Sequence, residues 1–167
     1  FPVRLLAVSA LGLFAGWWFY FKLGVDSVYI PFYGDFHLGG LFFILFFVIV
    51  TLATFSTGVI DGVDGLSGGV MSAVFAAYGM IAYLHGQVDI ATLCFVIVGG
   101  IMAFLWFNIP PARFVMGDVG SFALGTSLGV VAMLTDTLLL LPVIGFVFVV
   151  EGGSSLVQIT SKSVKFL

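Results

Sequence analysis

Charged residues are scarce in this sequence. Only 8% of the 167 residues are charged, whereas 62% are hydrophobic and 17% are aromatic. A water-soluble domain carries roughly 25% charged residues, which cover its surface. This chain cannot cover itself in that way, so we expect lipid to surround most of it.

Basic runs and cysteine pairs are also missing. The net charge is -3, and no basic segment is present that would bind nucleic acid. The single cysteine, Cys94, excludes an internal disulfide framework and lies in an apolar run. The sequence has no initiator Met and no signal-peptide pattern. We therefore expect it to be a segment of a longer protein.

Six apolar stretches are long enough, or nearly so, to cross a membrane, which takes roughly 17 to 25 residues. Lipid offers backbone groups no hydrogen-bond partner, so such segments form helices. The sequence predicts an all-α fold, a polytopic transmembrane helical bundle that forms a single membrane domain over residues 1–167. The expected spans are about 5–21, 38–54, 66–84, 90–107, 119–135 and 137–160, the last interrupted at Glu151-Gly152-Gly153.

Basic residues predict the orientation of these spans, because cytoplasmic loops carry an excess of Lys and Arg. With the N-terminus in the cytoplasm, four of the five basic residues fall inside and only Lys22 falls outside. Trp17 and Trp18 then mark the outer interface and Trp106 the inner one. The loops at about 55–65 and 108–118 come to lie on the same, cytoplasmic face, where they could form one site.

The first of these loops carries two aspartates in the sequence VIDGVDGL. Asp61 and Asp64 are three residues apart, so on a helix they would share a face, and the glycines beside them let a ligand approach the backbone. Asp-Gly pairs are also common in simple turns. Ionisable groups at the edge of a membrane are costly and usually functional. Both interpretations stay open on these residues alone.

The second loop, FNIPPARFVMGDVGS, begins with two prolines that end a helix, Pro110 and Pro111. Asp118 precedes the next apolar run, where it could cap a helix or bind Mg²⁺. This ion is often held by one or two carboxylates together with substrate phosphates, and a helix N-terminus favours phosphate. We interpret Glu151 as a structural polar residue at a helix break, and His37 and His85 as solvated loop residues.

These motifs resemble those of the polyprenyl-phosphate N-acetylhexosamine-1-phosphate transferases, most closely the bacterial muramoyl-pentapeptide branch. The resemblance covers essentially the whole chain, as the middle and later part of a ten-span enzyme. The matching elements are Asp61 to Leu66, Phe104 to Asn108, Pro111-Ala112, Met116 to Ser121, Phe148 to Glu151 and Leu156 to Gln158.

The resemblance implies a Mg²⁺-dependent phosphotransfer at the cytoplasmic face of the bacterial plasma membrane, in peptidoglycan synthesis. Undecaprenyl phosphate attacks the sugar-linked phosphate of UDP-N-acetylmuramoyl-pentapeptide, which gives lipid I and UMP. It further implies that Asp61, Asp64 and Asp118 are catalytic and that Asp118 binds Mg²⁺. Asn108, Asp61, Asp64 and Phe114 are the implied substrate-binding residues. Members of the family often form homodimers, so a homodimer is a further expectation.

Two positions differ from the family pattern. Gly58 stands where the family has Asn, and Val115 where it has an aromatic residue, although Phe114 lies one place earlier. The family's upstream Asp-Asp pair and downstream His-rich loop are absent, so we expect the isolated segment to be inactive. Three alternatives remain: a UDP-N-acetylglucosamine:polyprenyl-phosphate phosphotransferase of the same family, a non-catalytic homologue, and a membrane transporter with intramembrane carboxylates.

Overall fold

Helices make up most of the described part of the chain. The computed structural model describes residues 2–22, 24, 27–30, 34–37, 39–60 and 65–154. The long helices are α1 (Pro2–Trp17), α2 (Leu41–Ile60), α3 (Leu66–Leu84), α4 (Val88–Asn108) and α5 (Gly117–Leu134). By length and composition, α3, α4 and α5 can each cross a membrane. The predicted all-α class is confirmed.

Local chemistry explains where α3 and α4 end. α3 stops at Leu84, and the three residues 85–87 reverse the chain, with the Gln87 N–H donating to Ala82 O over 2.9 Å. α4 stops at Asn108 because Ile109 is extended, with ψ at 138°. A residue before proline is driven out of the helical region in this way. α3 therefore coincides with the stretch 66–84 that the sequence predicts.

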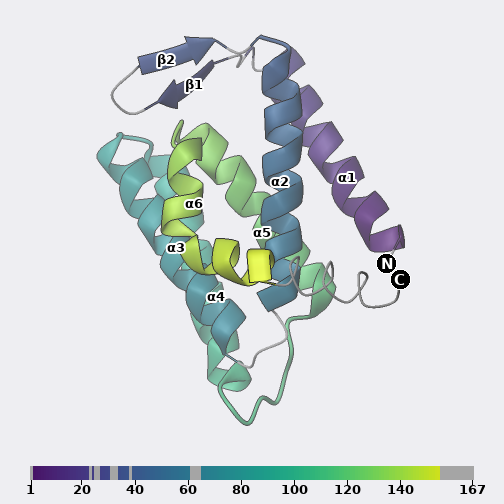
Figure 1. The fold of residues 1–167 in the computed structure, drawn as a ribbon. Helices are drawn as coiled ribbons and strands as arrows, with labels where there is room; N and C mark the ends of the chain where they lie inside the picture. The colour runs from purple at the N-terminus through teal and green to yellow at the C-terminus, as the bar shows by residue number, and fades with distance from the viewer. Residues whose placement is uncertain are drawn as a thin grey trace.

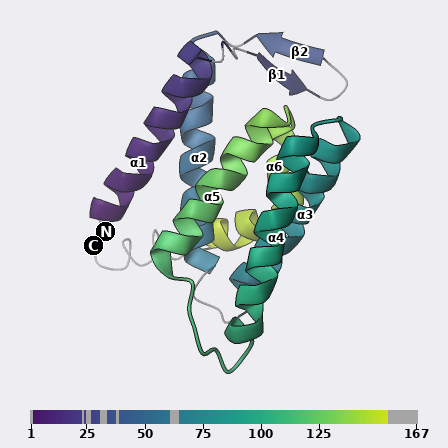
Figure 2. The ribbon, with the colours of Figure 1, turned by 180° about the vertical axis from the view of Figure 1, so that it is seen from behind.

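The long helices form two packed pairs, and α1 packs against one of these pairs. α3 lies along α4, α2 lies along α5, and α1 packs on α2 (Figures 1 and 2). Between α3 and α4 the contact is close, since a Cβ at Gly79 would lie 3.1 Å from the Cβ of Cys94. Cys94 is buried. Tyr78, Phe75 and Met71 of α3 are fully buried in the core.

A hydroxyl pair links α2 to α5. Thr54 Oγ1 donates to the carbonyl of Val50 at 2.7 Å, one turn earlier in α2. Its single hydrogen is thereby used, so the 3.2 Å bond to Thr126 Oγ1 of α5 is donated by Thr126. Thr54 is fully buried. A satisfied polar contact thus lies within an otherwise apolar helix interface.

A small β-hairpin connects α1 to α2, between the expected spans 5–21 and 38–54. After the π-helical residues Trp18–Lys22 (η1), strand β1 (Ser27–Ile30) pairs antiparallel with β2 (Gly34–His37), Ser27 lying opposite His37. The hairpin lies at the end of the bundle where α1 ends and α2 begins (Figure 1). His37 is exposed there, as is His85 between α3 and α4.

In the last expected span, 137–160, the chain turns before the break that was predicted at residues 151–153. The 3₁₀ turn η2 (Leu138–Leu140) leads into α6 (Leu141–Ile144), the chain turns at Gly145, and residues 146–154 are helical. The predicted break at Glu151-Gly152-Gly153 is therefore wrong. Packing accounts for the continuous helix, because Gly152 lies so close to α2 that a Cβ there would approach Ser56 Oγ to 2.7 Å. Tertiary contact outweighs the poor helix propensity of glycine.

The structure also contradicts the interpretation of Glu151 as a structural polar residue at a helix break. It lies inside the helical residues 146–154, and its side chain is exposed. A carboxylate that faces outward does not act as a buried polar anchor at a helix break. The sequence could not show this, because the position of residues 146–154 depends on their contact with α2.

Candidate functional site

One buried amide joins the two loops that carry the sequence motifs. Asn108, the last residue of α4, is only 4% exposed. Its Oδ1 accepts a hydrogen bond from the N–H of Gly65 at 2.9 Å, and its Nδ2 donates to the carbonyl of Phe114 at 2.8 Å. The chain immediately after Asp64 and the chain before Asp118 are thus held at the same end of the bundle, as the sequence analysis expected.

Gly65 sets the backbone conformation with which the first loop leads into α3. It precedes α3 in the left-handed conformation, with φ at 77°, and its carbonyl accepts the N–H of Gly69 at 3.1 Å. Glycine adopts this conformation without the steric cost that a Cβ brings. The predicted catalytic residues Asp61 and Asp64 lie outside the described residues. Gly65 is the first residue after Asp64 that the structure describes.

The second loop is held by its own backbone and by a ring contact. The N–H of Arg113 donates to the carbonyl of Phe107 at 2.8 Å, and the Phe107 and Phe114 rings meet edge to face, with centroids 5.8 Å apart. The Phe114 side chain is nevertheless 61% exposed. A largely exposed aromatic ring therefore lies at the edge of the candidate site, on a backbone that is fixed by hydrogen bonds.

Asp118 lies in the first turn of α5 and is half-buried. The N-cap position is Met116, so Asp118 is not the N-cap residue of this helix. The hydroxyl of Ser121 donates to the carbonyl of Gly117 at 3.0 Å, which fixes the same turn. A carboxylate in a first turn is stabilised by the positive end of the helix dipole. Asp118 thus has a defined backbone position beside α5's N-terminus.

The fit of a metal ion depends on Asp118. Among the described residues, no group of three or more His, Cys, Asp and Glu side chains could hold a metal. Magnesium suits such a sparse set, because it keeps several waters and takes one or two carboxylates in addition to substrate phosphates. The hard carboxylate oxygens of Asp118 fit one such ligand position. The predicted metal site remains a prediction.

Two contributors to this site were missed by sequence reasoning. The backbone N–H of Gly65 and the hydroxyl of Ser121 both position motif residues. Asn108 was expected to bind substrate, whereas its amide bonds the backbone on both sides. An Asn head group is one of the few that both donate and accept. That property was visible in the sequence, but its partner 43 residues away was not.

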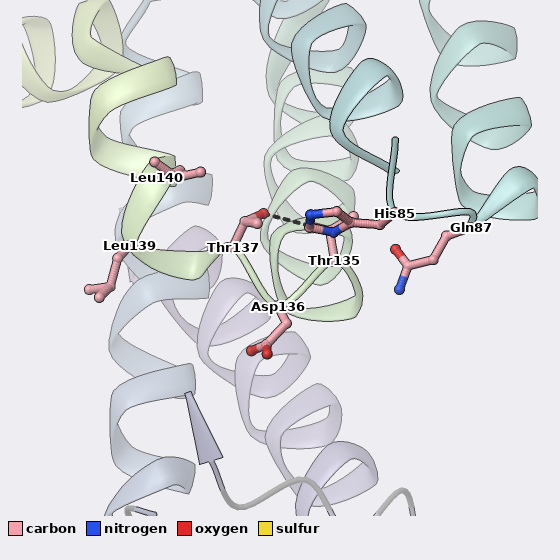
Figure 3. A pocket seen from close by; sticks show the side chains of 7 residues that line it. All are labelled: His85, Gln87, Thr135, Asp136, Thr137, Leu139 and Leu140. Atoms are coloured by element: carbon pink, nitrogen blue, oxygen red, sulfur yellow. Dashed lines mark hydrogen bonds between the residues drawn. The ribbon is translucent and has the colours of Figure 1, made fainter. Parts of the chain in front are cut away.

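The opposite end of the bundle contains a pocket of about 450 Å³. Figure 3 shows its lining, with the 2.7 Å hydrogen bond between the hydroxyls of Thr135 and Thr137. None of the predicted site residues belongs to it. The candidate site therefore lies at the Asn108 end of the helices. The lining residues are His85, Gln87, Thr135, Asp136, Thr137, Leu139 and Leu140.

Comparison with known proteins identifies the family. A family model described as glycosyl transferase family 4 matches residues 2–136. The chain belongs to glycosyl transferase family 4. The match includes both loops that Asn108 joins, together with Asp118. It confirms the family-level resemblance that the motifs indicated.

Three similar proteins share one name. The phospho-N-acetylmuramoyl-pentapeptide-transferase of Levilactobacillus brevis is 42% identical over 137 residues, covering 81% of this chain and 42% of that protein. The protein of that name from Chloroflexus aurantiacus (strain J-10-fl) is 41% identical over 133 residues, covering 78% and 36%. The one from Listeria monocytogenes serotype 4b (strain CLIP80459) is 38% identical over 155 residues, covering 82% and 48%. This chain spans less than half of each relative's length.

Proposed function

We propose that this chain forms part of a Mg²⁺-dependent phosphotransferase. The enzyme transfers phospho-N-acetylmuramoyl-pentapeptide from its UDP-activated form to undecaprenyl phosphate and releases UMP and lipid I. The observation that carries the proposal is the double hydrogen bond of Asn108, which brings the two motif loops together at one end of apolar helices. The names of the relatives supply the substrate class.

Phosphoryl transfer suits this arrangement, because it depends on positioning and charge neutralisation more than on covalent chemistry by the protein. Asp118 is the residue that would hold Mg²⁺, which supplies positive charge to the reacting phosphates. The N-terminus of α5, a helix of 18 residues, favours phosphate at the same place. The exposed ring of Phe114 offers a face for the uracil base.

The position of the loops suits two substrates of different solubility. The loops lie at the ends of helices that are long and apolar enough to cross a membrane. A nucleotide sugar would reach them from water, and a polyprenyl phosphate would reach them from the bilayer. The excess of basic residues on this side in the sequence supports a cytoplasmic location at the bacterial inner membrane.

The test is a UMP-release assay on the full-length protein in detergent, with undecaprenyl phosphate and either UDP-N-acetylmuramoyl-pentapeptide or UDP-N-acetylglucosamine. We expect UMP only with the first nucleotide sugar, and loss of UMP release when EDTA removes Mg²⁺. Release with UDP-N-acetylglucosamine alone would assign the other substrate. Nucleotide-sugar binding without any release would identify a non-catalytic homologue.

A further inference from the structure

The side chain of Asn108 is in an unusual position for a substrate ligand. It is almost completely buried, and both ends of its amide are engaged by backbone groups of two different loops. A buried donor or acceptor that loses its partner is costly. Oδ1 and Nδ2 could each make one further hydrogen bond, but the side chain is only 4% exposed, which leaves a ligand little access to them. A ligand that displaced either existing bond would leave the Gly65 N–H or the Phe114 carbonyl without its partner.

We propose that Asn108 is a positioning residue, which sets the spacing between the two motif loops and does not itself bind the substrate. This inference rests on the proposed function for its catalytic consequence. The geometric part stands on the two hydrogen bonds alone. Asn108 thereby acts through Phe114 and through the chain that follows Asp64.

The Phe114 side of the contact fixes a backbone while leaving a ring available. Asn108 Nδ2 donates to the Phe114 carbonyl, and the Phe107 ring packs against the Phe114 ring in a T-shaped arrangement, yet the Phe114 side chain is 61% exposed. The main chain four residues before Asp118 is therefore fixed. A nucleobase on the Phe114 ring would have a defined distance to the first turn of α5.

The Gly65 side of the contact occupies a backbone donor at the start of α3. The first N–H groups of a helix have no partner within the helix, and the residue before α3 is in the same position. Asn108 Oδ1 provides the partner for the Gly65 N–H, and Gly65 directly follows Asp64. The same side chain thus restrains the chain on both sides of the site.

Two variants of Asn108 separate the two bonds. Asn108→Ala removes both. Asn108→Asp keeps an oxygen for the Gly65 N–H but, when ionised, offers no hydrogen to the Phe114 carbonyl. Gln87→Ala is the matched control, since it removes an amide that donates to the Leu134 carbonyl at the opposite end of the bundle, over 3.0 Å. Circular dichroism checks that each variant retains its helix content.

The first readout is hydrogen exchange of the Gly65 amide in the ligand-free, full-length protein. We expect Asn108→Ala to speed exchange at Gly65 about fivefold or more, the factor that corresponds to loss of one ordinary hydrogen bond. Asn108→Asp should change it less, and Gln87→Ala should leave it unchanged. Unchanged exchange in Asn108→Ala would overturn the proposal, whether or not the protein is an enzyme.

The second readout is steady-state UMP release. A positioning residue affects turnover through misalignment of the reacting groups, so we expect both Asn108 variants to lower kcat about tenfold or more. A residue that only bound substrate equally in ground and transition states would raise KM and leave kcat unchanged. That pattern would overturn the proposal. Absence of UMP release from the wild-type protein would instead contradict the proposed function and leave the exchange result valid.

Discussion

The left-handed backbone of Gly65 leads to a prediction about a single residue. With φ at 77°, an alanine there would carry a strained Cβ, although its nearest neighbour would be Pro110 Cδ at a harmless 3.7 Å. We expect Gly65→Ala to lower the free energy of unfolding by about 1 kcal/mol through the backbone alone. Denaturant unfolding in detergent, followed by circular dichroism, measures the change.

Gly69 provides the control for this prediction. It lies inside α3, and no heavy atom lies within 4 Å of the position of an added Cβ. Alanine has the better helix propensity, so Gly69→Ala should be neutral or stabilise the fold by a few tenths of a kcal/mol up to about 1 kcal/mol. If both variants lost the same stability, the left-handed conformation of Gly65 would not be the cause.

The identity of the site residues could be predicted from the sequence better than their roles. Asn108 and Asp118 stand out because they are polar residues in motifs between apolar runs. The hydrogen bond from Gly65 to Asn108 depends on how two distant loops meet, and no local pattern encodes that. Asp61 and Asp64 remain predictions from the motif.

At the scale of elements, the contact between α2 and α5 depends on Thr54. Thr54→Val keeps the shape but removes the hydroxyl that accepts from Thr126. Hydrogen bonds between membrane helices contribute about 0.6 kcal/mol on average and about 1.7 kcal/mol at most. We expect a loss of stability in that range, measured by unfolding in detergent.

Thr92→Val is the matched variant in α4. Thr92 Oγ1 donates to the carbonyl of Val88 at 2.8 Å, one turn earlier, and it is exposed. Thr54 makes the same local bond and has an interhelical one in addition. Thr92→Val should therefore cost clearly less than Thr54→Val. A larger loss from Thr92→Val would show that the local bond, and not the contact between helices, carries the effect.

Some helices and strands could be predicted from the sequence, and others could not. The bounds of α3 could be predicted, because a largely apolar stretch without charged residues lies between the polar turns that contain Gly65 and Gly86. The β-hairpin between α1 and α2 was missed, since its two strands have only four residues each and form through their pairing. The break was predicted at Glu151-Gly152-Gly153, whereas the chain turns at Gly145 and residues 146–154 are helical. Local sequence does not encode the close approach of Gly152 to Ser56 of α2.

The whole molecule has two ends that differ in their residues and in their expected side of the membrane. Residues 109–116, which connect α4 to α5, lie at the candidate-site end, and the turn between α3 and α4, which contains His85, lies at the end with the hairpin (Figure 1). In cells that express the full-length protein, a membrane-impermeant maleimide should label His85→Cys from outside. It should label Val115→Cys only after the membrane is permeabilised. Both native side chains are exposed, whereas Cys94 is buried and should give little background. The reverse labelling pattern would contradict the cytoplasmic location.

We propose that the end of the bundle that carries Asn108 performs Mg²⁺-dependent phosphotransfer through Asp118. The most direct test is UMP release by full-length Asp118→Asn, compared with Asp89→Asn, which changes an aspartate in the first turn of α4 at the opposite end. We predict normal membrane insertion for both variants and wild-type turnover for Asp89→Asn. Asp118→Asn should lose at least about a hundredfold in kcat, since a metal ligand contributes several kcal/mol. Wild-type turnover by Asp118→Asn would contradict the account.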